Sequence, residues 1–290
     1  MPDIVIHALA AAAYAGLAWH FWRTRWRAGE AGVATGTSPA ERAALLVPLT
    51  LHGYLLQADL FAPGGLRFGF AHALSAMMWL AVAFYWIESL FYRLEGMQPP
   101  ALALAALAAP LPAVFPGRES GALAASLEFR LHVLLAMLAY SLFTIAILHA
   151  LLMALLERKL HRSGAGRGAG GALLAEGAAM LSGPLAALPP LLTLERLLFR
   201  LIAAAFVLLT CTLATGAAFS ETLFGQPLRF DHKTLFALLS WATFAFLLAG
   251  RHLYGWRGRP ALRWTLAGFV MLLLAYVGSR FVLEVVLGRG

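Results

Sequence analysis

Apolar residues form long unbroken runs along this chain and do not alternate with polar ones. A helix needs about 20 mostly apolar residues to cross the hydrocarbon core of a membrane. Runs near this length predict eight spanning helices, at residues 3–22, 43–59, 68–90, 99–115, 129–156, 196–219, 233–250 and 262–284. A membrane β-barrel would instead show alternating segments of about 10 residues. The pattern predicts an all-α, polytopic integral membrane helix bundle.

The composition also indicates a protein embedded in the membrane, with a simple domain organisation. The chain is 61% apolar and only 12% charged, and its mean hydropathy is +0.77. A water-soluble domain of this length would carry about twice as much charge. We expect a single membrane domain over residues 1–290. The longest connection, 157–190, is rich in glycine and predicts a flexible cytoplasmic linker with an interfacial segment over 172–188.

The basic residues indicate an orientation, because Lys and Arg in short loops stay on the cytoplasmic side. Most of the 22 basic residues follow predicted spans one, three, five and seven. They are Arg23, Arg25, Arg27, Arg42, Arg93, Arg158, Lys159, Arg162, Arg167, Arg196, Arg200, Arg251, Arg257, Arg259 and Arg263. Both termini are therefore predicted outside, in the periplasm. Topology and attraction to anionic lipid explain the net charge of +8, so we expect no nucleic-acid partner.

A histidine pattern repeats at matched depth. His72 and His132 each open the pattern His-x-Leu-x-Ala-Met at the outer start of an apolar run. His52 and His232 approach the same side of the membrane. An intramembrane histidine is costly and needs a partner. Two interpretations stay open: helix packing by neutral imidazoles, or axial ligation of haem iron between two helices with an apolar slot for the macrocycle.

A single cysteine narrows the chemistry. Cys211 allows no disulfide, no Cys-x-x-Cys redox pair and no covalent haem attachment. A structural zinc site is disfavoured, because such sites usually use cysteine among four ligands. Of the acidic residues in the apolar runs, Glu88 is expected to reach the interface toward Arg93. Glu284 is expected to pair with Arg280, four residues earlier.

The second half of the chain resembles the cytochrome c assembly membrane-protein family, which includes CcsA, CcmC, HemX-like and YpjD-like branches. The resemblance is carried by LPPLLTLERLLFRLIAAAFVLLTCTLATG and by FGQPLRFDHKTLFALLSWATFAFLLAGRHLYGWRGRPALRWTLAGFVMLLLAYVGSR. Haem-handling members have a tryptophan-rich outer loop with Trp-Asp-x-Lys-Glu. Here the loop reads Phe230-Asp231-His232-Lys233-Thr234, so the match is closer to the HemX/YpjD branch.

The resemblance implies non-covalent haem b and a set of site residues. His72 and His132 would be the axial ligands of the iron. His232 would be a loop ligand or gate, with His52 near the same side. Lys233 would pair with a haem propionate, and Asp231 would orient the neighbouring imidazole. The alternative for Asp231 to Lys233 is an ordinary helix start with an aspartate cap.

The sequence thus predicts a multi-pass haem-binding protein of the bacterial inner membrane, related to cytochrome c biogenesis, that handles or exports haem on the periplasmic side. Lipid, haem and a second membrane or periplasmic assembly protein are the expected partners. Because binding makes or breaks no bond, we expect no enzyme and no catalytic residues. The alternative is a haem-free regulatory or scaffold subunit that acts through a protein partner.

Overall fold

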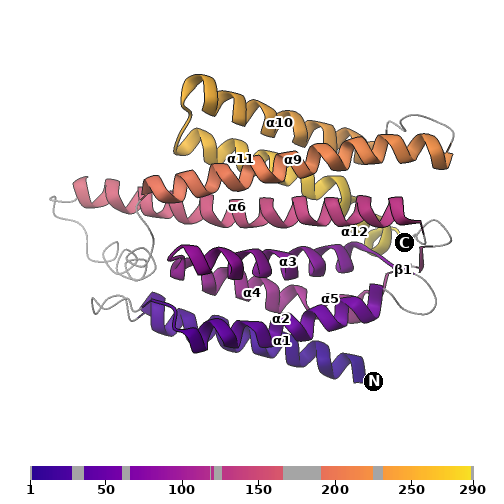
Figure 1. Ribbon diagram of the computed structural model, residues 1–290, viewed down its shortest axis with the longest axis horizontal. Helices are drawn as coiled ribbons and strands as arrows, with labels where there is room; N and C mark the ends of the chain where they lie inside the picture. The colour runs from indigo at the N-terminus through magenta and orange to yellow at the C-terminus, as the bar shows by residue number, and fades with distance from the viewer. Residues whose placement is uncertain are drawn as a thin grey trace.

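The computed structural model describes residues 2–27, 36–60, 66–117, 119–120, 126–165, 191–224 and 231–288, and these residues form a bundle of long helices lying side by side (Figure 1). The first part contains α1 (Pro2–Phe21), η1 (Trp22–Arg27), α2 (Pro39–Leu60), α3 (Phe70–Phe91), η3 (Glu95–Met97), α4 (Gln98–Ala108) and α5 (Leu111–Val114). The second contains α6 (Leu127–Ala165), α9 (Leu191–Phe224), α10 (His232–Tyr254), α11 (Arg259–Leu273), η5 (Leu274–Gly278), α12 (Ser279–Phe281) and η6 (Val282–Val286).

The helices form two groups that meet mainly where α3 packs on α6. In the first group α1 packs on α2 and α4, and α3 packs on α2 and α4. In the second group α6 packs on α9 and α11, and α10 packs on α9 and α11. The contact between α3 and α6 joins the groups, as Figure 1 shows. These two helices carry the two copies of the histidine pattern.

Six helical segments of the described chain are long and apolar enough to cross a membrane. They are Ile4–Trp26, Phe70–Phe91, Leu127–Glu157, Leu191–Ser220, His232–Tyr254 and Arg259–Val286. The protein is thus an all-helical, multi-pass membrane protein. The helix α2 is not among the six, and the proline-broken segment Gln98–Val114 is shorter. The count of eight spans and the outer position of both termini stay predictions.

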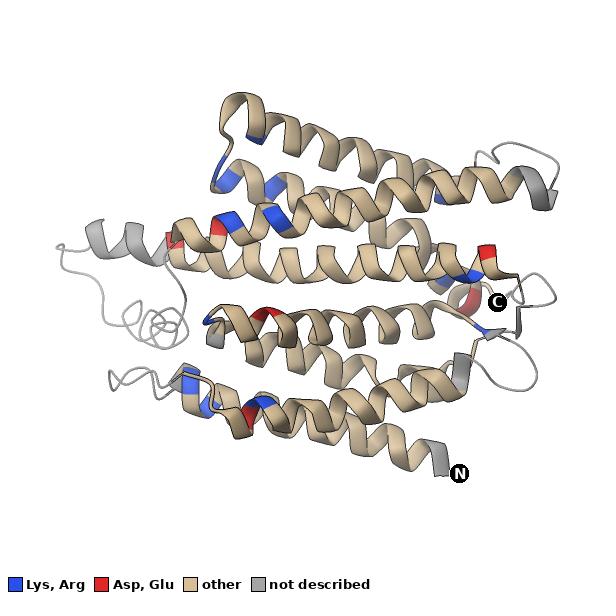
Figure 2. Cartoon of the chain, viewed as in Figure 1, with Lys and Arg blue, Asp and Glu red and all other residues tan. Residues whose placement is uncertain are grey.

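Charge is distributed unequally between the two ends of the bundle. Figure 2 shows most Lys and Arg residues of the described helices at the end opposite the two termini. This is the distribution that the positive-inside rule associates with the cytoplasmic face. We therefore call this end the arginine-rich end, and the end with the termini the outer end.

The connections differ in part from the sequence prediction. The first part of the predicted linker, 157–165, continues α6 as a helix. The predicted interfacial segment 172–188 lies outside the described residues. At the outer end, two short strands, β1 (Leu66–Arg67) and β2 (Glu119–Ser120), pair antiparallel. This small ladder brings the segment before α3 next to the segment after α5.

The Gly-Trp-Arg-Gly turn after α10 has a clear local cause. Gly255 ends the helix in the left-handed conformation, with φ +65°. Trp256 then folds back over Gly250, where an added Cβ would clash with the indole. Arg251 of α10 and Arg257 of the turn form ion pairs with the buried Glu195 of α9. The turn therefore fastens α9 to α10 at the arginine-rich end.

Candidate functional site

His132 is held against α9 near the outer end of the bundle. Its Nδ1 lies 3.0 Å from the hydroxyl of Thr215. Gly216 leaves room for the ring, because a Cβ there would lie 3.2 Å from His132 Cε1. Phe219 packs edge-on to the imidazole, with ring centroids 6.3 Å apart. Three successive contacts along α9 thus fix the orientation of this ring.

The hydrogen bonds of Thr215 identify the tautomer of His132. A hydroxyl has one proton, and that of Thr215 points to the carbonyl oxygens of Cys211 and Thr212, at 2.9 and 3.0 Å. With its proton directed to those carbonyls, Thr215 Oγ1 accepts from His132, and the neutral ring then carries its own proton on Nδ1. His132 Nε2 keeps its lone pair. A metal-ligating imidazole typically has this arrangement, with the other ring nitrogen donating to a fixed acceptor.

His72 has a different environment. Its side chain is 1% exposed, within the first turn of α3. It lies against the backbone of Gly117, where an added Cβ would come within 3.2 Å of His72 Nδ1. Gly117 has φ +66° and belongs to the segment just before β2. The two histidines are on neighbouring helices, but their rings contact different parts of the protein. Their pairing as axial ligands stays a prediction.

His52 lies fully buried between three helices. Its Nε2 is 2.8 Å from Ser75 Oγ of α3, and its Nδ1 is 3.4 Å from the hydroxyl of Tyr14 of α1. Both ring nitrogens thus have protein partners, so the contacts of His52 favour a packing role over the predicted place in a cofactor site. His7 of α1 is also buried and donates from Nδ1 to the carbonyl of Ala109, at 2.8 Å. The residues next to His7 in the sequence do not indicate this partner.

The segment Asp231 to Lys233 forms the start of α10. Asp231 accepts hydrogen bonds from the backbone and hydroxyl of Thr234, at 2.9 and 3.1 Å, which is an N-cap. Partial burial alone would raise the pKa of Asp231, but these bonds and the charge of Lys233 hold it below its ordinary value. His232 is exposed. The capping interpretation is confirmed, while haem contacts of His232 and Lys233 stay predictions.

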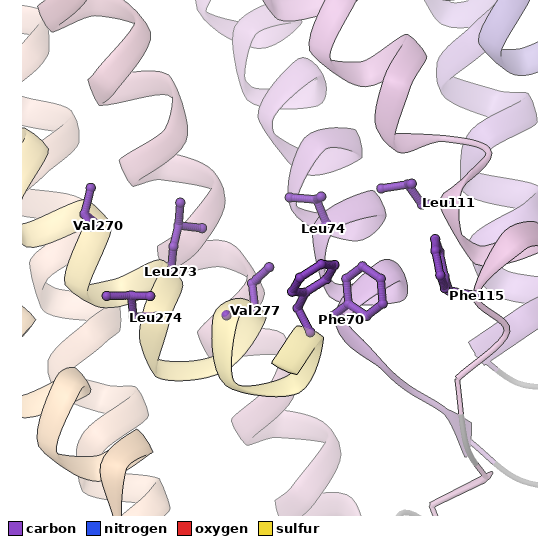
Figure 3. Close-up of a pocket in the computed structure, with 10 residues that line it drawn as sticks. Phe70, Leu74, Leu111, Phe115, Val270, Leu273, Leu274 and Val277 are labelled. Atoms are coloured by element: carbon purple, nitrogen blue, oxygen red, sulfur yellow. The ribbon is translucent and has the colours of Figure 1, made fainter. Parts of the chain in front are cut away.

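An apolar pocket of about 510 Å³ lies beside α3 at the outer end (Figure 3). Its lining is Phe70, Leu74, Leu111, Phe115, Val270, Leu273, Leu274, Val277, Gly278 and Phe281. Phe70 and Leu74 are four residues apart and share one face of α3, whereas His72 projects from another face. This pocket therefore lies between α3 and the last helix, whereas the paired-histidine hypothesis requires a slot between spans three and five.

The carboxylate of Glu284 closes the outer end of this region. Its Oε2 accepts from the backbone N–H of Phe70, at 3.3 Å, at the start of α3. Arg280 lies 3.8 Å from Glu284 Oε1, so the predicted pair is confirmed. A Cβ at Gly69 would come within 2.7 Å of Glu284 Oε2, so the glycine leaves room for this carboxylate. The last helix is thereby fastened to the helix that carries His72.

The sequence did not predict a pair of polar residues that lies toward the arginine-rich end. Glu88 of α3 does not reach Arg93 by any contact that the structure records. Its Oε2 instead lies 3.6 Å from His149 Nε2 of α6. The side chains are 12% and 0% exposed. The residues are far apart in the sequence, and the only signal was that each is a polar residue in an apolar run.

Within the described ranges, no three His, Cys, Asp or Glu side chains gather closely enough to hold a metal ion. Any ligand set in this part of the chain thus has at most two such side chains. A bare metal centre of three or more protein ligands is excluded for the described residues. Axial ligation of haem needs only one or two imidazoles and is compatible with this result.

Comparison with known proteins gives partial matches to curated proteins. The chain is 38% identical over 99 residues to the inner membrane protein YpjD of Escherichia coli K12, which covers 34% of this chain and 37% of that protein. It is 36% identical over 88 residues to the cytochrome c biogenesis protein CcsA of Prochlorococcus marinus, covering 30% of this chain and 28% of that protein. The chain thus spans about a third of the length of these relatives. No solved structure matches.

A match to a family profile covers far more of the chain. The profile described as Cytochrome C assembly protein matches residues 38–287, from just before α2 to the end of the last helix. Only α1 and its π-helical end precede this region. Together with the bundle of apolar helices, this match identifies the chain as a member of the cytochrome c assembly protein family.

Proposed function

We propose that this protein binds haem b non-covalently and handles it on the outer side of a bacterial inner membrane during cytochrome c biogenesis. The observation that carries the proposal is the contact of His132 Nδ1 with the Thr215 hydroxyl, 3.0 Å away, which suits a ring that has its proton on Nδ1 and a lone pair on Nε2. Family membership and the names of the YpjD and CcsA relatives support the haem and inner-membrane assignments. Bound haem would supply an iron centre, which the imidazole of His132 would hold.

In this proposal each residue around His132 has a defined role. His132 provides the imidazole nitrogen, and Thr215 keeps that ring in the ligating tautomer. Phe219 and Gly216 fix the plane of the ring against α9. Lys233, at the same end of the bundle, offers a cation for a propionate. These residues bind and orient and carry out no bond chemistry, so the proposal is a binding and hand-over protein and not an enzyme.

The test is a spectrum of the purified full-length protein, expressed with added haem and isolated in mild detergent. Stoichiometric haem in reduced-minus-oxidised spectra is expected, and His132→Ala should remove it. His252→Ala is the matched control, because His252 is an exposed histidine near the arginine-rich end of α10. Wild-type protein without stoichiometric haem would favour the second candidate, a haem-free scaffold subunit.

One outcome would reject His132 as the ligand but would still support haem binding. Haem that stays bound in the His132→Ala variant would show that another residue ligates the iron. His232→Ala then tests the exposed loop histidine, whose loss should not affect folding because the residue is exposed. The second candidate is favoured by the short loop, in which Phe224 and Phe230 replace the tryptophans typical of haem-handling members.

A further inference from the structure

The pair formed by Glu88 and His149 presents two buried acceptor atoms to each other. The Nδ1 of His149 donates to the carbonyl of Ile145, one turn earlier, at 3.0 Å. A carbonyl can only accept, so a neutral His149 carries its proton on Nδ1 and has a lone pair on Nε2. That lone pair faces Glu88 Oε2, 3.6 Å away. Neither atom has a hydrogen-bond partner in the described part of the chain.

Two facing acceptors in a dry interface repel each other and leave both atoms unsatisfied. Such a group costs more in hydrocarbon than in water, because no solvent can replace the missing partner. A single proton satisfies both atoms at once when they close from 3.6 Å to hydrogen-bond distance, about 3 Å. It also makes the pair neutral overall, whether it resides on oxygen or on nitrogen. With no proton the pair would have a buried charge of −1, and with two a buried charge of +1.

We propose that Glu88 and His149 together bind one proton inside the membrane-spanning part of the bundle, held between Glu88 Oε2 and His149 Nε2. A hydronium ion from the solvent gives up this proton, and water is released. No other bond forms or breaks. The side chain of Glu88 is 12% exposed and that of His149 is 0% exposed, so Glu88 is the more accessible of the two groups to a proton. This exchange occurs near the arginine-rich end, since α3 ends three residues after Glu88.

Several other titratable groups at this end of the helices are engaged elsewhere. Glu195 of α9 is bound to Arg251 and Arg257. Arg200 of α9 reaches the hydroxyl of Tyr92, just beyond the end of α3, at 3.4 Å. On α3 itself, the nearest titratable residue is Tyr85, which lies one turn before Glu88 and is buried. Within the described helices, the site therefore consists of one carboxyl group and one imidazole.

The proton lies where α3 packs on α6, so it affects the packing of these two helices. The interface between α3 and α6 joins the two helix groups, and Glu88 and His149 lie on its opposite sides. A shared proton draws the two side chains, and with them α3 and α6, together. Without the proton, the two acceptor atoms repel each other. Proton binding thus tightens this interface. The inference does not depend on whether the protein binds haem.

The experiment locates the proton in the full-length protein in detergent or nanodiscs. Infrared difference spectra report the carbonyl band of a protonated carboxylic acid, and nitrogen NMR of labelled histidine reports protonation of Nε2. At neutral pH we expect one proton on the pair: either the acid band of Glu88 with a bare Nε2, or a protonated Nε2 with a carboxylate. Glu88→Gln should shift the titration midpoint of His149 by more than about one pH unit.

Matched variants assign these signals. Glu284→Gln is the control for the acid band, because the Glu284 side chain is 11% exposed and has Arg280 and a backbone N–H as partners. It should leave the His149 signal unchanged. His149→Asn provides a second assignment should Glu88→Gln fail to fold. The proposal would be overturned by a Glu88 carboxylate together with a bare His149 Nε2 at neutral pH, or by protons on both groups. It would also be overturned if Glu88→Gln left the titration midpoint of His149 unchanged.

Discussion

The two copies of the His-x-Leu-x-Ala-Met pattern fold into different surroundings. His132 is partly buried, and its ring is oriented by side chains and a glycine of α9. His72 is 1% exposed and lies against the backbone of a loop that a small β-ladder holds in place. The repeated pattern therefore predicted a place near the start of a helix for each histidine, but not what each ring contacts. The contrast makes His132 the first candidate ligand of the proposed haem site.

The largest expected effect comes from replacing each histidine in turn. His132→Ala should remove nearly all bound haem, because it deletes the nitrogen with the free lone pair. His72→Ala should reduce haem content less, since the ring of His72 is packed against Gly117. Haem per protein and the low-spin absorption band measure both. Equal and complete loss in the two variants would instead support the paired axial ligands and remove the contrast.

Thr215 tests why His132 differs from His72. Thr215→Val keeps the shape of the side chain but removes the acceptor for His132 Nδ1. Loss of such an outer partner typically lowers affinity at least about tenfold, which is about 1.4 kcal/mol. A haem titration of apoprotein measures this change. Thr212→Val is the control, because the hydroxyl of Thr212 bonds to the carbonyl of Leu208. Equal affinities of the Thr215→Val and wild-type proteins would contradict the tautomer assignment.

Gly117 tests the surroundings of His72. Gly117→Ala places a Cβ at a residue with φ +66°, about 3.1 Å from the backbone nitrogen of Gly69. The left-handed conformation alone costs about 1–2 kcal/mol for a residue with a Cβ. Thermal unfolding in detergent should show this loss. Gly16→Ala is the matched control, since nothing lies within 4 Å of a Cβ at that position. Haem bound through His132 should be unaffected in either variant.

The smallest effect concerns the loop next to the candidate ligands. Asp231→Ala should cost about 1 kcal/mol through loss of the N-cap. Asp231→Asn keeps an acceptor for Thr234 but cannot titrate. Because the pKa of Asp231 is lowered in the folded protein, its charge stabilises the fold above the unfolded-state value, about 4, and this stabilisation is lost as the pH falls through the folded-state pKa. The wild type should therefore approach the Asn variant in acid, as melting temperatures across pH would show.

The sequence predicted most of the helices because each one is a continuous apolar run. The cap at Asp231 and the pair of Arg280 with Glu284 were also predictable, because both are local in sequence. The partner of Glu88 was not predictable. It depends on which face of α6 meets α3, and hydrophobic periodicity says little about this when every face is apolar. The surroundings of His72 depend in turn on the loop backbone at Gly117.

One contact of α1 bears on the order in which the membrane protein is assembled. His7 lies 102 residues before its acceptor, the carbonyl of Ala109. During synthesis α1 enters the bilayer before α4 exists, so its imidazole is first exposed to lipid without that carbonyl. The hydrogen bond of His7 can therefore form only after α4 has been made. The family profile begins after α1, at residue 38, so this contact joins a helix outside the profile to a helix inside it.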